Sequence, residues 1–462
     1  MTEIYNKFRQ DSEIKASDHS HRQKIGYNIS RYDEAVVRGK QQYVNIELAR
    51  QRAANIKYKS ISELEKNLAD FEANFERNGG KVIWAQDAAD ALREIDTIMV
   101  KHNATRVVKS KTMVSEEIGL NEHLEGKGIE SLETDLGEFI VQQAGEPPYH
   151  IVTPAMHKSK EDVAKLFQDK FGMPANSTPE QITAYVRKLL REKFFFADVG
   201  ITGANFIIVD TGSVCLTENE GNGLLSMSFP RVHIVIAGIE KVIPSFRNLD
   251  LFWPLLATHG TGQNLTAYNS IISGPRQDGE IDGPQEMYVI LLDNGRSDLL
   301  ARKHQRRALS CIRCGACLNT CPVYKTIGGH TYGSTYSGPI GSVITPWLKG
   351  MNDFKHLSYA SSLCGSCSEV CPVKINLHEL LLYNRNDSIK MRTYSVFDAF
   401  SMYAWKKIML NRKWMDTGSG KLKNLVLNKV FARAWGQRRQ LPVISERNFK
   451  QLWEERREGK VK

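Results

Sequence analysis

The spacing of apolar residues from residue 60 onward predicts helices and strands that alternate along the chain. Apolar side chains that recur every three or four residues and end at a pair of glycines predict a first helix: Ile61, Leu64, Leu68, Phe71 and Phe75. The same spacing predicts helices at 88–101, 160–170 and 179–196. Continuous apolar runs predict buried strands at 82–85, 106–108, 206–209, 232–238 and 287–292, and a strand end at 151–154. Such alternation predicts a mostly parallel sheet with helices on both faces.

The pattern divides the chain into four parts. Residues 1–58 are polar and broken in pattern, and we expect an arm outside the core. Residues 59–295 form an α/β domain, followed by a polar, basic linker at 293–307. Residues 296–395 form a cysteine-rich domain, with a turn at 338–341 and a helix after Asn376. Residues 396–462 form a basic helical tail.

The composition is that of a globular protein with several domains. The chain has 462 residues, of which 41% are hydrophobic and 25% charged. The best candidate for a membrane span, residues 233–242, is interrupted by Glu240 and Lys241 and is shorter than the roughly 18 apolar residues required. The first twenty residues mix acids and bases without an apolar segment, so no secretory signal or transit peptide is predicted. We therefore expect a cytoplasmic protein.

The positive charge is concentrated in the C-terminal tail. The net charge is +10, and residues 403–462 hold 16 Lys and Arg but 5 Asp and Glu. Four tryptophans are interleaved with these cations: Trp405, Trp414, Trp435 and Trp453. This combination fits packing on the preceding domain or docking of an acidic partner, and it also fits peripheral association with the anionic inner face of a membrane. No nucleic-acid-binding module is recognisable, and we expect no nucleic-acid partner.

Seven of the eight cysteines lie between residues 311 and 371, which favours metal ligation over disulfides. The first run has the spacing C-x2-C-x2-C-x3-C-P of bacterial-type ferredoxins, and a shorter run with the spacing C-x2-C-x3-C-P follows. The first run comprises Cys311, Cys314, Cys317 and Cys321, and the second comprises Cys364, Cys367 and Cys371. When the prolines that follow the two runs are aligned, Ser361 stands where the second run lacks its first cysteine.

The two runs predict two iron–sulfur clusters. The last cysteine of each run is expected to serve the other cluster, because it lies too far along its own loop. The predicted ligands of cluster 1, a [4Fe-4S] cluster, are Cys311, Cys314, Cys317 and Cys371. The predicted ligands of cluster 2 are Cys321, Cys364 and Cys367. Cluster 2 is therefore either a [3Fe-4S] cluster or a [4Fe-4S] cluster with one iron held by another group.

Zinc binding or redox-active thiols are the alternatives to iron–sulfur clusters. Zinc uses four ligands in paired C-x2-C hooks, and seven cysteines with two Cys-Pro ends fit that arrangement poorly. Cys215 lies in an apolar run and is expected to be a small buried residue rather than an eighth ligand. Two adjacent clusters indicate electron transfer, unless an open iron in cluster 2 acts as a Lewis acid.

The α/β domain offers two candidate catalytic carboxylates, Glu218 and Glu220. They stand in a loop predicted after the strand at 206–209, and sites in open α/β sheets lie at such strand ends. A carboxylate there can act as a nucleophile or anchor a ligand. A solvated turn is the alternative, because no complete glycine motif for phosphate binding is present. Loops at 259–264 and 273–276 are expected to close the same cleft, with His259 forming hydrogen bonds within its loop.

Several stretches together resemble the lactate utilisation protein B family, the iron–sulfur subunit of a bacterial L-lactate oxidation complex. They span nearly the whole chain: residues 109–117, 200–223, 258–262 and 273–276, both cysteine runs, and the tail rich in Trp and Arg. The resemblance implies an α/β domain of the ribose-isomerase/CoA-transferase-like class, followed by an α-helical ferredoxin-like domain with two clusters. It also implies two companion subunits, one a cysteine-rich-domain protein and the other a second α/β-domain protein.

On this basis we expect a non-catalytic electron-transfer subunit that acts in the oxidation of L-lactate to pyruvate. The alternatives are an enzyme whose α/β domain performs acyl or CoA chemistry, an electron-transfer subunit of a related 2-hydroxy acid oxidase, and a scaffold that only docks partners. In CoA-transferases a glutamate in a Glu-Asn-Gly type loop is the nucleophile, and Glu218 stands in a similar sequence.

Overall fold

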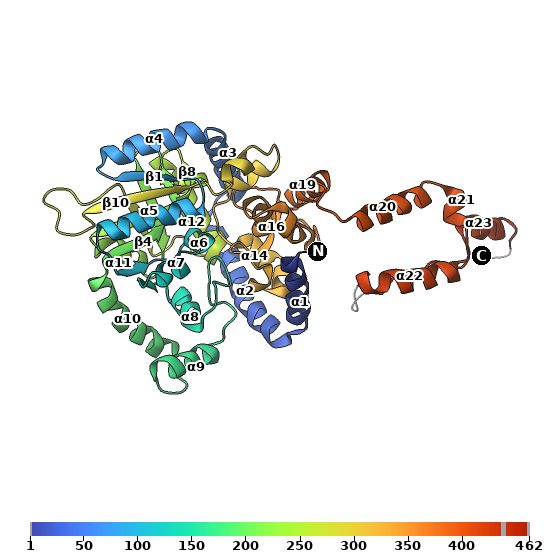
Figure 1. The fold of residues 1–462 in the computed structure, drawn as a ribbon, viewed down its shortest axis with the longest axis horizontal. Helices are drawn as coiled ribbons and strands as arrows, with labels where there is room; N and C mark the ends of the chain where they lie inside the picture. The colour runs from blue at the N-terminus through green and yellow to red at the C-terminus, as the bar shows by residue number, and fades with distance from the viewer. Residues whose placement is uncertain (1, 436–439, 460–462) are drawn as a thin grey trace. The chain divides into compact units, whose positions relative to one another are not determined.

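Figure 1 shows the fold of the chain in a computed structural model, which describes residues 2–435 and 440–459. The chain forms two compact units, Met1–Met391 and Arg392–Lys462. Four of the basic residues counted in the tail lie outside the described residues: Arg438, Arg439, Lys460 and Lys462.

A six-stranded parallel sheet forms the centre of the first unit and confirms the predicted α/β class. Its strand order is β1-β10-β7-β4-β2-β3, and every neighbouring pair is parallel. Along β7, Ile234 packs on one face of the sheet and Val235 on the other, and both are fully buried. An apolar run without polar alternation is therefore the mark of a strand covered on both faces. The strands are β1 (Lys81–Ala85), β2 (Arg106–Lys109), β3 (Glu130–Glu133), β4 (Val199–Gly203), β7 (Val232–Gly238) and β10 (Glu286–Leu292).

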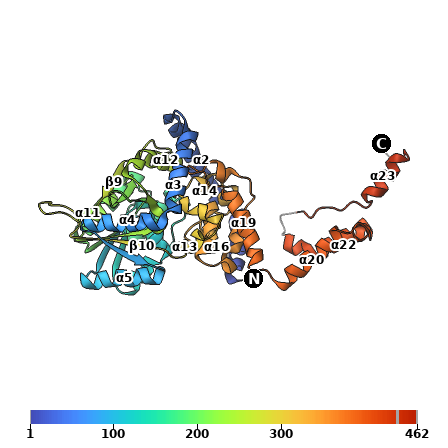
Figure 2. The same cartoon turned by 90° about the horizontal axis from the view of Figure 1, so that it is seen from above.

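Helices cover both faces of this sheet (Figures 1 and 2). The predicted first helix, α4 (Leu64–Arg77), packs on one face, where Phe71 and Phe75 are fully buried. The opposite face is covered by α5 (Ala88–Lys101), α6 (Met113–Glu117) and α7 (Leu120–Gly126). Near the edge strand β3, a further helical layer consists of α8 (Leu136–Ala144), α9 (Lys160–Phe171) and α10 (Pro179–Phe196).

A second sheet contains residues that the pattern predicted as a loop. β6 (Ser213–Glu218) pairs antiparallel with both β5 (Phe206–Ile208) and β9 (Tyr268–Ile272), and β8 (Val242–Ile243) lies parallel to β5. The loop predicted to reach Glu218 is therefore wrong, because β6 finds a pairing partner about fifty residues further along the chain and has little periodicity of its own. Cys215 on β6 is fully buried and accepts a hydrogen bond from Trp253 Nε1 at 2.9 Å, consistent with a structural role.

The N-terminal residues form core helices, which corrects the prediction of an arm. Ile25 and Ile29 are buried in a core shared with the cysteine module, and so is Ala53. The chain here reads as polar because each helix buries only a narrow apolar stripe. The helices are α1 (Glu3–Ser17), α2 (His19–Gly39) and α3 (Ile46–Ser62). One continuous core thus joins three of the predicted parts, and the boundaries at residues 58, 295 and 395 stay a prediction.

Three further local predictions are wrong for a common reason, burial against distant segments. The linker at 293–307 contains a helix that buries Arg296 and Leu299, α13 (Arg296–Leu300), and the start of η4 (Gln305–Ser310). The strand end at 151–154 is an irregular loop whose apolar side chains pack on the cysteine module. The turn at 338–341 opens a buried helix, α16 (Gly338–Leu348).

Short helices build the cysteine module. The predicted helix after Asn376 is α19, in which Leu377, Leu380 and Leu381 are buried. The helices are α14 (Ala316–Thr320), α15 (Pro322–Ile327), η5 (His330–Tyr332), α16, α17 (Met351–Tyr359), α18 (Ser366–Glu369) and α19 (Leu377–Lys390).

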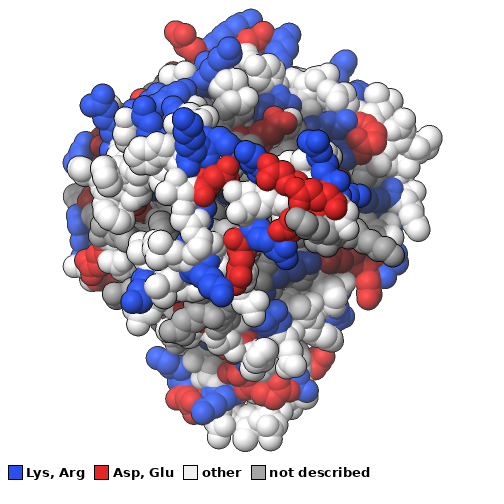
Figure 3. Space-filling model, turned by 90° about the vertical axis from the view of Figure 1, so that its right-hand side faces the viewer, with Lys and Arg blue, Asp and Glu red and all other residues white. Residues whose placement is uncertain are grey.

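The second unit consists of helices with exposed apolar side chains. Its helices are α20 (Val396–Met409), α21 (Arg412–Asp416), α22 (Gly420–Trp435) and α23 (Phe449–Arg457). All four tryptophans of this unit are exposed. On the face drawn in Figure 3, Lys and Arg are interspersed with Asp and Glu rather than gathered in one basic patch. Among the described residues, no helix combines the length and the apolar character needed to cross a bilayer.

A buried network of charges joins the α/β domain to the cysteine module. Arg296 is 1% exposed and lies between two carboxylates, donating to Glu117 Oε2 at 2.8 Å and to Glu240 Oε2 at 2.7 Å. Arg313 of the first cysteine loop reaches Glu240 Oε1 at 3.3 Å, and Tyr336 donates its hydroxyl to Glu117 at 2.6 Å. Burial alone would raise the pKa of Glu240, but these arginines and the neighbouring Lys241 lower it to about 2.

Replacing Arg296 by Met should lower the free energy of unfolding by about 3–5 kcal/mol, because two carboxylates would remain buried without their shared partner. Chemical denaturation measures this change. Arg302→Met is the control, because Arg302 lies in the same 293–307 segment but is exposed. Its guanidinium carbon lies 4.6 Å from the centre of the Trp347 ring. We expect the control to cost less than about 1 kcal/mol, and equal losses in the two variants would contradict the role of the network.

Candidate iron–sulfur site and adjoining cavity

The two cysteine loops share left-handed backbone conformations at two matching positions. The residues on either side of Cys314, Arg313 and Gly315, adopt left-handed φ values of 60° and 80°. Around Cys364 the corresponding φ values are 55° at Leu363 and 86° at Gly365. Gly315 precedes α14 and Gly365 precedes α18, so each loop winds tightly and then enters a short helix. The spacing of the cysteines thus corresponds to a structural repeat.

Ser361 occupies in the second loop the place that Cys311 holds in the first. The backbone N–H of Arg313 donates to Cys311 Sγ at 3.4 Å. The backbone N–H of Leu363 donates to Ser361 Oγ at 3.2 Å in the same two-residue pattern. The hydroxyl therefore lies in the local geometry of the absent thiol.

The fold brings the seven cysteines together as two neighbouring groups. The first group lines one small cavity: Cys311, Cys314, Cys317 and Cys371. Burial raises the pKa of Cys314, and the thiols of Cys311 and Cys371 raise it further. The second group shows the same mutual influence, because burial and then Cys321 and Cys364 raise the pKa of Cys367, to about 11. Burial raises the pKa of Cys317, and the nearby Cys367 thiol of the second group raises it further. The two groups therefore lie next to each other.

The donor set fits iron–sulfur clusters better than zinc. A tetrahedral zinc site with Zn–S bonds of about 2.3 Å would hold its sulfurs roughly 3.8 Å apart. No three cysteine sulfurs in the described chain lie within 4.8 Å of one another. A cubane distributes its thiolates over separate irons and holds them farther apart. Thiolate softness and the two-loop geometry therefore fit clusters at both groups.

Glu218 and Glu220 line a cavity of about 500 Å³ between the carboxyl ends of the strands and the first cysteine loop. Glu218 Oε2 accepts the backbone N–H of Gly223 at 2.7 Å, and Oε1 accepts that of Leu224 at 2.8 Å. Both oxygens thus bind the first turn of α11 (Asn222–Ser228), a stabilising contact for that helix end. Glu220 is less constrained, since Oε2 accepts only the backbone N–H of Leu136 at 3.1 Å.

The other residues expected at this cleft divide between it and the interior. Gly260 and Thr261 line the cavity, whereas His259 is buried within α12 (Leu249–Thr261) and bonds Leu255 O at 2.9 Å. The 273–276 loop does not line the cavity; Ser273 bonds the hydroxyl of Ser213 instead. Placing His259 in a loop was therefore wrong, because the helix extends to residue 261 despite its glycine.

Sequence reasoning missed the cations of the cavity. Lys241 and Arg313 line its wall next to the cysteine module, and Lys111 also reaches it. In the sequence pattern, Lys241 only interrupts an apolar run, and Arg313 stands in a two-residue gap between cysteines. The position of Arg313 inside the ligand loop was the available signal.

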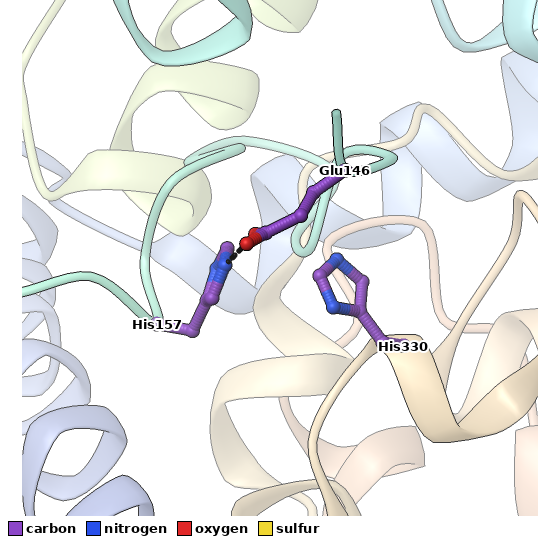
Figure 4. Close-up of side chains that lie close together, drawn as sticks. All are labelled: Glu146, His157 and His330. Atoms are coloured by element: carbon purple, nitrogen blue, oxygen red, sulfur yellow. Dashed lines mark hydrogen bonds and ion pairs between the residues drawn. The ribbon is translucent and has the colours of Figure 1, made fainter. Parts of the chain in front are cut away.

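A compact group of polar side chains joins the loop after α8 to the cysteine module (Figure 4). Glu146 accepts hydrogen bonds from His157 Nε2 at 2.6 Å and Lys158 Nζ at 2.8 Å, while His330 Nε2 donates to Pro147 O at 2.8 Å. Ligand-type atoms of Glu146, His157 and His330 lie within 4.8 Å of one another, as in two-histidine, one-carboxylate metal sites. Because Lys158 already neutralises Glu146, we interpret the group as a hydrogen-bonded contact between the two parts.

Comparisons with known families agree with the order of the two parts. The LUD domain family matches residues 68–292, and the 4Fe-4S dicluster domain family matches residues 307–375. The second match confirms the predicted iron–sulfur class of the cysteine module.

Relatives match the chain over most of its length. The "Lactate utilization protein B" of Bacillus licheniformis is 41% identical over 433 residues, which is 90% of each chain. The Bacillus subtilis protein of the same name is 46% identical over 75% of this chain and 72% of its own. The "Uncharacterized electron transport protein YkgF" of Escherichia coli is 46% identical over 73% of this chain and 70% of its own. A solved DUF162 family protein from Deinococcus radiodurans covers 50% of this chain and 98% of its own at 15% identity, but its TM-score of 0.29 supports no argument.

Acidification should destabilise the protein between about pH 6.5 and pH 4. Burial lowers the pKa of His157 from 6.5 to about 4, so between these values the unfolded chain binds a proton that the folded chain excludes. From pH 7 to pH 5.5, His157 alone should account for about 1 kcal/mol of lost stability. Urea denaturation at both pH values should therefore show a smaller acid loss in His157→Gln than in the parent. His19→Gln, at an exposed position, should behave as the parent; an unchanged acid loss in His157→Gln would contradict the prediction.

Proposed function

Because the chain belongs to the lactate utilisation protein B family, we propose that it is the iron–sulfur electron-transfer subunit for oxidation of L-lactate to pyruvate. The observation that carries this proposal is the pair of adjacent cysteine groups in a module packed on the cavity of the α/β domain. The name of the Escherichia coli relative, an electron transport protein, is in keeping with it. Iron–sulfur clusters supply single-electron transfer when bound.

The cluster ligands are proposed as two crossed sets. Cluster 1, a [4Fe-4S] cluster, is held by Cys311, Cys314, Cys317 and Cys371, which line one cavity. Cluster 2 is held by Cys321, Cys364 and Cys367. The matching geometry of Ser361 supports a site with three thiolates, as a [3Fe-4S] cluster or a [4Fe-4S] cluster with a hydroxyl, water or another group on one iron.

Two features of the chain suit the proposed clusters: positive charge near the first cysteine group and solvent exposure of the second. Arg313 and Lys241 put positive charge beside Cys311. This charge would stabilise the reduced form of a cluster bound at that cysteine. Cys364 is exposed, so the second group reaches the surface, where a companion subunit can exchange electrons. The companions we propose are a cysteine-rich-domain protein and a second α/β-domain protein. The exposed Trp and Lys of the tail suit docking of an acidic companion, with an anionic membrane surface as the alternative.

The geometry does not favour acyl or CoA chemistry at Glu218. A nucleophilic carboxylate needs an oxygen free to attack, and both oxygens of Glu218 accept backbone N–H groups. Electron transfer therefore accounts for more of the structure than catalysis by this chain alone.

The proposed function predicts that the chain oxidises L-lactate only in its native complex. The purified chain with reconstituted clusters should show no turnover with L-lactate and an artificial electron acceptor, whereas the complex isolated from native cells should reduce the acceptor and show reduced clusters by electron paramagnetic resonance. Turnover by the lone chain would contradict the subunit role, and a complex whose clusters stay oxidised with L-lactate would contradict the function.

The crossed ligand sets predict which variants lose which cluster. Aerobic preparations should show a [3Fe-4S] resonance, because a site with three thiolates loses its labile iron under mild oxidation. Cys367→Ser should remove that resonance and keep a [4Fe-4S] signal after reduction, whereas Cys371→Ser should damage the [4Fe-4S] cluster. Cys215→Ser is the control outside both groups and should keep both signals. Loss of the [3Fe-4S] resonance alone in Cys371→Ser would show that the sets are not crossed.

A further inference from the structure

The cavity in the α/β domain adjoins the first cysteine group. Cys314 lines both the cavity of about 500 Å³ and the smaller one formed by the four cysteines of the first group. The volume falls within the range of ligand sites in proteins. A molecule bound here would lie next to the proposed cluster 1.

One wall of this cavity carries cations, and one of them has unused hydrogen-bonding capacity. The side chain of Arg313 is 10% exposed, and its Nη1 has no hydrogen-bond partner within the described chain. Its guanidinium is held in place by Glu240 at 3.3 Å and by the ring of Tyr336 at 4.4 Å. Lys241 is 9% exposed and lines the same cavity. A buried donor without a partner is costly, so Arg313 Nη1, with the Lys241 ammonium on the same cavity lining, is suited to an anion.

Another part of the cavity lining carries oxygen acceptors. Asp135 and Glu218 are committed to helix ends: Asp135 accepts one backbone N–H, and Glu218 accepts two. Glu220 keeps one oxygen, Oε1, without a hydrogen-bond partner among the described residues. Burial, then Asp135 and Glu218, raises the pKa of Glu220 to about 7. Glu220 can therefore either accept a hydrogen bond from a hydroxyl or donate one to a carbonyl near neutral pH.

We propose that this cavity binds a small 2-hydroxy- or 2-oxo-carboxylate, with its carboxylate on Arg313 and Lys241 and its 2-oxygen toward Glu220. The proposal rests on the proposed function for the choice of acid, while the charge distribution on the cavity lining supplies the recognition. The cavity is larger than a three-carbon acid and leaves space for bound water. The chain would then hold the acid beside its own cluster ligands in addition to carrying electrons.

The same cations also offset the negative charge of thiolates in the ligand loop, so the test must separate the two roles. Arg307 is the matched control. Arg307 is half-buried and lies outside the cavity. Burial lowers its pKa, the Cys371 thiol raises it, and its guanidinium carbon lies 4.7 Å from the centre of the Tyr58 ring. A variant at Arg307 changes the charge near the first cysteine group without touching the cavity.

Anaerobic isothermal titration calorimetry of the reconstituted full chain with L-lactate, pyruvate and propionate tests the proposal. L-Lactate or pyruvate should bind saturably, and propionate, which lacks the 2-oxygen, at least tenfold more weakly. Lys241→Gln and Arg313→Gln should each weaken binding at least tenfold, and Arg307→Gln should bind within about twofold of the parent. Lys241 lies outside the ligand loop, so its variant remains informative if Arg313→Gln loses iron.

The proposal would be overturned if neither acid bound the parent, if propionate bound equally well, or if Lys241→Gln bound as the parent does. Equal weakening in Arg307→Gln would also overturn it, because charge near the thiolates alone would then explain the effect. Failure here is distinguishable from failure of the proposed function. If the native complex is reduced by L-lactate while this chain binds neither acid, only the site assignment is wrong.

Discussion

The arrangement of the first unit depends on the neutralisation of buried charge around Arg296. A guanidinium this deeply buried is tolerated only with excellent partners, and Glu117 and Glu240 come from separate segments of the α/β domain. Arg313 shares Glu240 and belongs to the first cysteine loop, so the network constrains how the module docks on the sheet. The orientation of the first cysteine group toward the cavity follows from this constraint.

This docking arranges the cavity, the first cysteine group and the second cysteine group in sequence toward the surface. The cavity lies at the carboxyl ends of the strands, Cys314 borders it, and Cys317 connects the first cysteine group with the second. The second group ends at the exposed Cys364. Two adjacent cysteine groups thus lie between the cavity and the surface, as the proposed electron-transfer function requires. The N-terminal helices support the layout, since Lys57 donates to the carbonyls of Glu240 at 2.7 Å and Val242 at 3.0 Å.

The two cysteine loops show how local backbone conformation specifies a ligand geometry. Residues in the left-handed conformation stand on both sides of Cys314 in the first loop and of Cys364 in the second. On the C-terminal side the residue is a glycine, which adopts this conformation without steric strain. Arg313 and Leu363 adopt the same conformation without that advantage, which indicates that the surrounding packing enforces it. The repeat persists even where Ser361 replaces a cysteine.

The amino-acid sequence by itself determined the features that depend on short-range spacing. Strands β1, β2, β7 and β10, helices α4, α5, α9 and α10, the cysteine runs and the buried character of Cys215 all follow from periodicity or residue type within a few positions. Strands β3 and β4, which complete the parallel sheet, have no such local signal. The tertiary structure decided what depends on residues far apart in the chain. The N-terminal helices became core elements, Glu218 became the support of a helix end, and Arg296 of an apparent linker became a buried ion-pair partner. Burial and pairing of a charge are set by neighbours far away in the sequence, as for Glu117 and Arg296, and no local pattern records them.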